Sequence, residues 1–145
     1  MSDRIAIKNQ DLVLNVSHNV NPAVWSEDKY DQFVSRLCGT REYQKEAIWT
    51  TLRYLLGEQY ANLEQLAHEN WRNGNNEALA AKFKTFELFR ERLSFPDKLA
   101  GSLDLATGTG KSYVLYGLAA IMLAEGKVDR VLVLCPSTTI EDGLL

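Results

Sequence analysis

The chain has 145 residues, of which 46% are hydrophobic and 24% are charged, and its formal net charge is −3. This composition is typical of a globular domain and excludes a disordered tail or a fibrous repeat. The charge gives no general basic signature, so contacts with nucleic acid would have to come from local groups. No apolar run has the length of a membrane span, and the first residues contain no signal-peptide core. We therefore expect a cytoplasmic protein that does not contact a membrane. The two cysteines, Cys38 and Cys135, are too few for a disulfide framework and are expected to be reduced, buried thiols.

Residues 1–25 are expected to form an N-terminal strand segment. Apolar residues alternate in this segment, first at Ile5 and Ile7 and then at Leu12, Leu14 and Val16. This period of two predicts a strand, with a hairpin turn through residues 9–10.

Two amphipathic helices are predicted next. The stretch "SEDKYDQFVSRLC" predicts a helix that is capped by Ser26 and ends at Gly39. The stretch "REYQKEAIWTTLRYLL" predicts a second helix, capped by Thr40 and closed by Gly57.

A further pair of helices is predicted between about residues 58 and 93, with the turn "NGNN" between them. We interpret residues 58–96 as an inserted helical hairpin. Its aromatic side chains fit a hydrophobic core better than a platform for stacking bases; they are Trp71, Phe83, Phe86 and Phe89.

The hydrophobic pattern changes after residue 101. Residues 102–106 predict a strand, residues 111–125 a helix that is apolar on nearly every side, and residues 130–135 a strand buried on both faces. A strand, a crossover helix and a second strand form a βαβ unit. The sequence therefore predicts an α/β fold with a parallel sheet.

The stretch "ATGTGKS" lies between the first of these strands and the helix. Gly108 and Gly110 allow backbone N–H groups to curve around a phosphate chain, and the N-terminus of the following helix attracts anions. Lys111 can reach the outer phosphates, and the Ser112 hydroxyl can hold Mg²⁺. This pattern predicts a phosphate-binding P-loop, although Leu105 stands where the usual leading glycine would be. The alternative is a glycine-rich turn without a ligand.

Three stretches together resemble a known family. "LATGTGKS" is similar to motif I of superfamily 2 helicases and translocases, in the DEAD/DEAH-box-like group that contains the restriction subunits of type I and type III restriction enzymes. "TREYQKEAI" resembles the adenine-reading segment of that group, and "VLVLCPSTTIEDGLL" resembles its motif Ia. The resemblance implies that residues 26–145 are an incomplete first RecA-like domain that binds ATP and Mg²⁺.

The resemblance also assigns residues. Gln44 would read the adenine edge with its amide, and Arg41 would lie beside the base or brace Gln44; the alternative for Gln44 is a solvated position at a helix start. Lys111 and Ser112 would serve catalysis, and Ser112 would hold the Mg²⁺. The remaining expected nucleotide contacts are Thr107, Gly108, Thr109, Gly110 and Tyr113. The expected contacts with the nucleic-acid backbone are Pro136, Ser137, Thr138 and Thr139, whose alternative role is a helix cap.

The function implied is the N-terminal part of an ATP-dependent DNA helicase or translocase of a restriction or antiviral defence system. Double-stranded DNA would be its substrate, and a methyltransferase or another defence subunit its partner. Hydrolysis also needs a carboxylate and an arginine, which the resemblance places after residue 145, so we expect a piece of a longer chain that is inactive alone. Three alternatives remain open, namely an RNA helicase of the same superfamily, a P-loop NTPase or kinase for small molecules, and a non-catalytic nucleotide-binding fragment.

Overall fold

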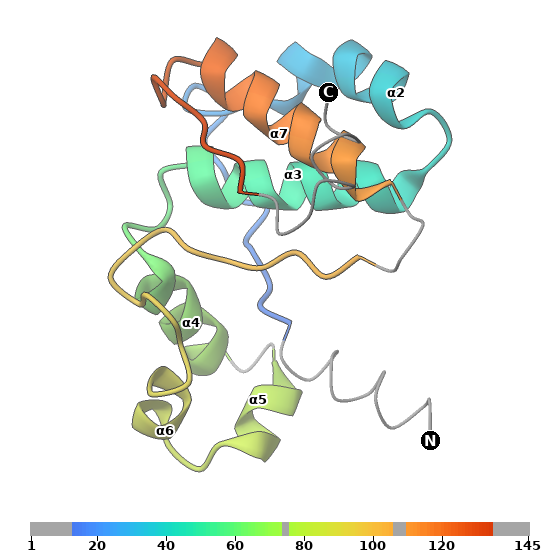
Figure 1. The fold of residues 1–145 in the computed structure, drawn as a ribbon. Helices are drawn as coiled ribbons and strands as arrows, with labels where there is room; N and C mark the ends of the chain where they lie inside the picture. The colour runs from blue at the N-terminus through green and yellow to red at the C-terminus, as the bar shows by residue number, and fades with distance from the viewer. Residues whose placement is uncertain (1–12, 74–75, 106–109, 135–145) are drawn as a thin grey trace. The chain divides into compact units, whose positions relative to one another are not determined.

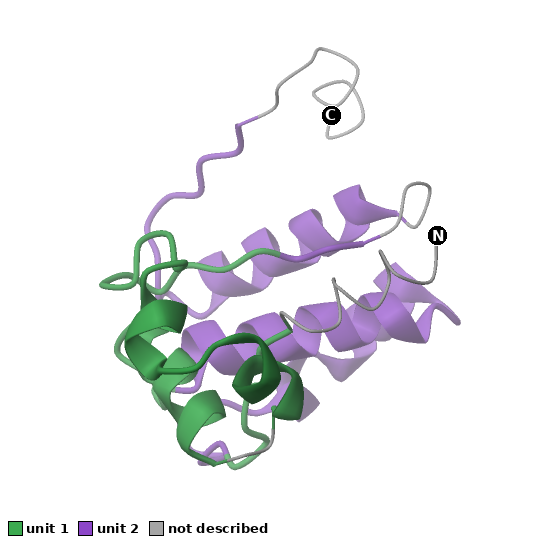
Figure 2. Ribbon diagram, turned by 90° about the horizontal axis from the view of Figure 1, so that it is seen from below, with its two compact units in different colours: residues 1–19, 58–102 green, residues 20–57, 103–145 purple. Residues whose placement is uncertain are grey.

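The computed structural model describes residues 13–73, 76–105 and 110–134, and these residues form helices joined by loops (Figure 1). The helical elements in chain order are η1 (Glu27–Tyr30), α2 (Asp31–Cys38), α3 (Glu42–Leu56), α4 (Leu63–Arg72), α5 (Glu77–Lys82), α6 (Phe86–Arg90) and α7 (Lys111–Ala124). Among the described residues, no helix has the length and apolar character needed to cross a membrane. The chain divides into two compact units, residues 1–19 with 58–102 and residues 20–57 with 103–145, which Figure 2 colours separately.

The predicted parallel sheet is wrong for the part of the chain that the structure describes. Residues 102–105 and 130–134 were expected to be strands, but no strand is assigned to them. Their side chains are largely open to solvent, and Leu132 and Leu134 are 81% and 82% exposed. A strand needs a partner with which it can form ladder hydrogen bonds. The local apolar pattern predicts burial on both faces, but it cannot supply that partner.

The second unit is built on the packing of α3 against α7, with α2 beside them (Figure 1). The buried side chains of its core come from all three helices and from the loop before η1; they are Trp25, Val34, Cys38, Ile48, Leu52, Leu56, Val114 and Ile121. Leu105 packs against this core. The predicted helix over residues 111–125 is thus confirmed as α7, and burial of its inner face fixes it on α3.

The ends of α2 and α3 agree with the glycine signals but not with the predicted caps. Gly39, with φ 61°, follows α2, and Gly57 follows α3. Ser26 precedes η1 without a side-chain capping hydrogen bond, and Arg41 rather than Thr40 is the N-cap of α3. The predicted single helix after Ser26 begins as a turn of 3₁₀-helix before it continues as α2.

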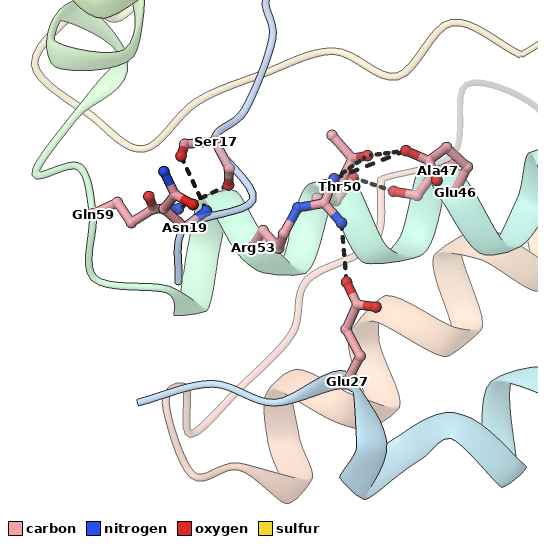
Figure 3. A network of polar contacts seen from close by, with 9 residues as sticks. Ser17, Asn19, Glu27, Glu46, Ala47, Thr50, Arg53 and Gln59 are labelled. Carbon is pink, nitrogen blue, oxygen red and sulfur yellow. Dashed lines mark hydrogen bonds and ion pairs between the residues drawn. The ribbon is translucent and has the colours of Figure 1, made fainter. Parts of the chain in front are cut away.

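A buried arginine ties η1 to α3. Arg53 is only 5% exposed, and its guanidinium makes an ion pair with Glu27 at 3.0 Å. The same side chain donates to Thr50 Oγ1 at 3.1 Å, and that hydroxyl donates to Glu46 at 3.2 Å (Figure 3). A buried charge is tolerated only when it is paired and hydrogen-bonded. This network therefore holds η1 against α3 within the second unit.

The first unit contains α4, α5 and α6, where two helices were predicted. The break between α5 and α6 lies at residues 83–85, because Phe83 has an extended backbone and Thr85 caps α6 by accepting a hydrogen bond from Leu88 N at 3.3 Å. The predicted aromatic core is present. Phe89 is buried, and Trp71, Phe83 and Phe86 pack against the cluster that it forms with Ala67 and Leu79. The predicted boundaries of the helical insertion and of the N-terminal segment stay predictions. The predicted N-terminal strand is wrong where the structure describes it, because no strand is assigned to residues 13–16. Residues 1–12, which include the predicted hairpin turn, lie outside the described residues.

Candidate nucleotide-binding site

The first feature of the site is the start of α7. Gly110 is the N-cap and has a left-handed backbone, with φ 79° and ψ 44°, which a residue with a Cβ rarely adopts. Lys111 and Ser112 are the first two helical residues, no side chain caps this end, and the first turn contains no acidic residue. A helix N-terminus carries a partial positive charge and free N–H groups, so this end of α7 suits an anion.

Gln44 is the second feature of the site. It lies on α3, is fully buried, and donates a hydrogen bond from Nε2 to the carbonyl oxygen of Gly110 at 3.4 Å. The two residues are 66 positions apart in the chain, so tertiary packing brings them together. A Cβ on Gly110 would collide with this amide and would lie 3.1 Å from the Tyr113 ring. Glycine is therefore required here both by the backbone conformation and by the approach of Gln44.

Close packing of α7 on α3 holds this arrangement. At Gly117, a Cβ would lie 2.9 Å from Leu37 Cδ2 and 3.0 Å from Ile48 Cδ1. Gly117 is buried, as are Val114 and Ile121 on the same face of the helix. The small residue lets α7 approach α3 closely, and this fixes the distance between Gln44 and the start of α7.

An open hollow of about 480 Å³ borders the site. Residues 36–41 line it together with Tyr113, and the Arg41 guanidinium lies over the Tyr113 ring at 5.9 Å from its centroid. Such a cation–π contact is worth about 0.5–1 kcal/mol at an exposed site. Cys38 lies at the edge of the hollow with 3% exposure, and burial raises the pKa of its thiol. This thiol is therefore neutral near pH 7 and unsuited to act as a nucleophile.

Gln44, Arg41 and Tyr113 are thus near the start of α7, where Gly110, Lys111 and Ser112 lie. The roles predicted for these six residues stay predictions. The other predicted contacts lie outside the described residues; they are Thr107, Gly108, Thr109, Pro136, Ser137, Thr138 and Thr139. Within the described ranges, no group of three or more His, Cys, Asp or Glu residues could hold a metal ion.

The sequence prediction missed Gly117, which sets the approach of the two helices. A signal was available, because a glycine inside an otherwise strongly apolar helix lowers helix stability and usually has a packing reason. It also missed the hollow beside Arg41. A hollow between helices has no sequence signature, although Arg41, which lines it, was predicted to lie beside the base or to brace Gln44.

An apolar helix whose glycine-capped N-terminus is open to an anion is a feature of nucleotide-binding proteins. Residues 37–145 match the family described as type III restriction enzyme, res subunit. The match covers most of the chain, and the chain belongs to this family. The resemblance of its three motifs to restriction subunits is thereby confirmed. No curated protein and no solved structure matches the chain.

The family consists of helicase-like, ATP-dependent enzymes that act on nucleic acid and are related to helicase superfamily 2. Its members use ATP and Mg²⁺. The general class of hydrolase expected from the sequence agrees with this membership.

Proposed function

We propose that this chain provides the ATP-binding site of a DNA helicase or translocase that works in a restriction or antiviral defence system. One observation carries the proposal. Gly110 has a left-handed backbone as the N-cap of α7, where no side chain caps the helix and where Lys111 and Ser112 lie, and the buried Gln44 amide contacts its carbonyl oxygen.

The phosphates of ATP would bind at the N-terminus of α7. Thr107, Gly108, Thr109 and Gly110 supply the loop backbone in this proposal, and the first N–H groups of α7 add their partial positive charge. Lys111 neutralises the outer phosphates, and the Ser112 hydroxyl is a ligand for Mg²⁺. An ion held there would supply neutralisation of the phosphate charge.

The base would lie near the hollow beside Arg41 and Tyr113. Both side chains present flat faces suited to stacking, and together they lie within reach of the start of α7. Gln44 has the amide donor and acceptor that an adenine edge requires. Because its Nε2 also contacts the Gly110 carbonyl, Gln44 connects base recognition to the conformation of the phosphate loop.

The partners remain proposals as well. Double-stranded DNA would contact Pro136, Ser137, Thr138 and Thr139, and a methyltransferase or another defence subunit would assemble with the protein. Family membership favours nucleic acid over a small molecule as the substrate. Stimulation of ATP hydrolysis distinguishes the alternatives. DNA activates a DNA helicase, RNA activates an RNA helicase, and neither activates a small-molecule NTPase.

The proposal is tested with the Lys111→Ala substitution. Binding of a fluorescent ATP analogue is measured with and without Mg²⁺ for the parent chain, for Lys111→Ala and for a control, Lys84→Ala, which removes an exposed lysine from the other compact unit. Loss of the charge-assisted contacts of Lys111 is expected to weaken binding at least tenfold, whereas the control leaves it unchanged. Equal affinity of all three proteins would refute the assignment of the phosphate site.

Gln44→Ala tests base recognition. If Gln44 reads adenine, the variant loses the preference for ATP over GTP, CTP and UTP, because another base no longer leaves buried polar groups unmatched. If Gln44 only supports Gly110, all four nucleotides weaken by the same factor. A preserved ranking of the four affinities contradicts the proposed reading of the base.

A further inference from the structure

A polar hollow of about 270 Å³ belongs to the first unit alone. The side chains that line it are Gln59, Tyr60, Gln65, His68, Glu69 and Arg72. Four of them lie on α4 at positions 65, 68, 69 and 72, which is the spacing of one helix face. None of the six side chains is aliphatic, so the hollow suits a polar ligand that forms several hydrogen bonds.

Hydrogen bonds fix the wall that Gln59 and Tyr60 form. The Tyr60 hydroxyl donates to Glu69 Oε1 at 2.6 Å and accepts from Ser17 N at 3.2 Å. Gln59 Nε2 donates to Ser17 O at 3.1 Å (Figure 3). Side chains that are fixed before a ligand binds lose little conformational entropy on binding. The Glu69 carboxylate is therefore already held in place by a side chain that is only 7% exposed.

Glu69 and Arg72 bring an acceptor and a donor to the hollow without pairing with each other. They stand three positions apart on α4, where opposite charges often pair. Among the described residues, however, the Arg72 guanidinium makes no ion pair and no hydrogen bond, and Glu69 Oε2 accepts none. Gln65 Oε1 accepts from Ala61 N at 2.8 Å, which leaves its Nε2 as a further donor. A ligand with donors beside an acceptor would therefore satisfy both charged groups.

Guanine has these groups on one edge of its ring system. Its N1–H and N2–H₂ groups are neighbouring donors that a carboxylate can accept, and its O6 atom beside them is an acceptor that arginine commonly binds. Adenine has an acceptor, N1, in place of the N1–H donor, so a carboxylate is unsuited to it. The family acts on nucleic acid, which makes a base the expected kind of ligand.

We propose that this hollow binds an unpaired guanine base of nucleic acid. Glu69 accepts from N1 and N2, Arg72 donates to O6, and the His68 ring adds a flat surface for stacking. Base pairing uses the same N1, N2 and O6 groups, so a guanine within a duplex cannot bind in this way. This site is separate in function from the ATP site, and it requires only that the protein acts on nucleic acid.

Binding is measured by fluorescence anisotropy with the whole chain and three labelled pentadeoxynucleotides. They have four thymines and, at the centre, guanine, hypoxanthine or adenine; hypoxanthine is guanine without its N2 amino group. We expect the guanine oligonucleotide to bind about tenfold more tightly than the other two, because each of them leaves the carboxylate with fewer donors. Matching ribonucleotides and free GMP and AMP show whether DNA, RNA or a free nucleotide supplies the base.

Two matched pairs of variants test the contacts. Glu69→Gln keeps an oxygen for the Tyr60 hydroxyl but removes the charged acceptor, so the preference for guanine over hypoxanthine should fall from about tenfold to about twofold. Arg72→Gln should weaken binding of the guanine oligonucleotide about tenfold. Glu91→Gln and Arg92→Gln make the same charge changes at exposed positions outside the hollow and should change neither value.

Lys111→Ala separates this site from the ATP site. The variant should bind the ATP analogue more weakly and keep its preference for the guanine oligonucleotide. If the guanine preference is lost as well, the base binds at the start of α7 and the assignment to the first unit is wrong.

Three further results would overturn the assignment. The first is equal affinity of the parent chain for the three oligonucleotides. The second is a guanine preference that survives Glu69→Gln unchanged. The third is an NMR signal of the Arg72 Nε–H group that shifts no more with the guanine oligonucleotide than with oligothymidine.

Discussion

Replacing Gly110 by alanine tests the geometry of the candidate site through folding stability. The left-handed backbone costs a residue with a Cβ about 1–2 kcal/mol. The new Cβ also collides with the Gln44 amide and comes within 3.1 Å of the Tyr113 ring. Overpacking of this kind costs about 1–3 kcal/mol. We expect Gly110→Ala to lower the free energy of unfolding by about 2–5 kcal/mol, the sum of the two effects.

The collision is separated from the backbone strain by a double-mutant cycle. In a Gln44→Ala background the amide is gone, so Gly110→Ala should cost the backbone strain of about 1–2 kcal/mol and the remaining close contact with the Tyr113 ring. Gly39 is the control, because it also has a positive φ, of 61°, but nothing lies within 4 Å of its Cβ position. Gly39 has ψ −123°, outside the left-handed α region, so Gly39→Ala should cost about 1–3 kcal/mol, and this cost should be the same in both backgrounds.

The free energies are measured by urea unfolding followed by circular dichroism, with linear extrapolation to water. A coupling energy of about 1–3 kcal/mol between positions 44 and 110 is expected, and none between positions 44 and 39. If Gly110→Ala costs the same with and without Gln44, the amide does not approach Gly110 as the structure places it, and the reasoning fails.

Two further predictions follow, one for each unit. Gly117→Ala places a methyl group against Leu37 and Ile48. It should lower the free energy of unfolding by about 1 kcal/mol, because the cost of overpacking exceeds the gain in helix propensity. In an Ile48→Val background this cost should be smaller in the same urea assay. Burial and the hydrogen bond to Glu69 raise the pKa of Tyr60 to about 12 from 10.0. The folded state therefore favours the neutral phenol, and the stability it contributes is complete below pH 10.0 and is lost as the pH rises to about 12. Between pH 10.0 and about 12, Tyr60→Phe should lose less free energy of unfolding than the parent chain. An equal loss in the two proteins would contradict the assigned cause.

Local signals in the sequence predicted helices well but not strands. Gly39 ends α2 with a positive φ that a residue with a Cβ rarely adopts, and Gly57 follows α3. The strands at residues 102–106 and 130–135 were predicted from apolar runs, and a strand depends on a partner that such a run does not encode. The break at Thr85 was missed because aromatic residues continue on both sides of it, whereas the capping hydroxyl decides the local conformation.

The elements of the candidate site were predictable as patterns, but their meeting was not. The start of a helix at Lys111 follows from the glycine-rich stretch before it. That Gln44 lies on Gly110 follows only from the packing of α3 on α7, which depends on Gly117 and on the side chains that surround it. Sequence spacing of 66 residues contains no information on this distance.

Each of the two units has a polar residue on the buried stripe of one helix. Gln44 stands in line with Ile48 and Leu52 on α3, and Asn70 stands in line with Leu63, Leu66 and Ala67 on α4. An amide in such a position destabilises the fold unless it is hydrogen-bonded, so its partner must be part of the structure. For Gln44 the partner is the backbone of Gly110, and for Asn70 it is the backbone of Asn15. In both units a buried amide thus fixes a segment distant in sequence, and replacing either by an apolar residue should release that segment before it unfolds the helices.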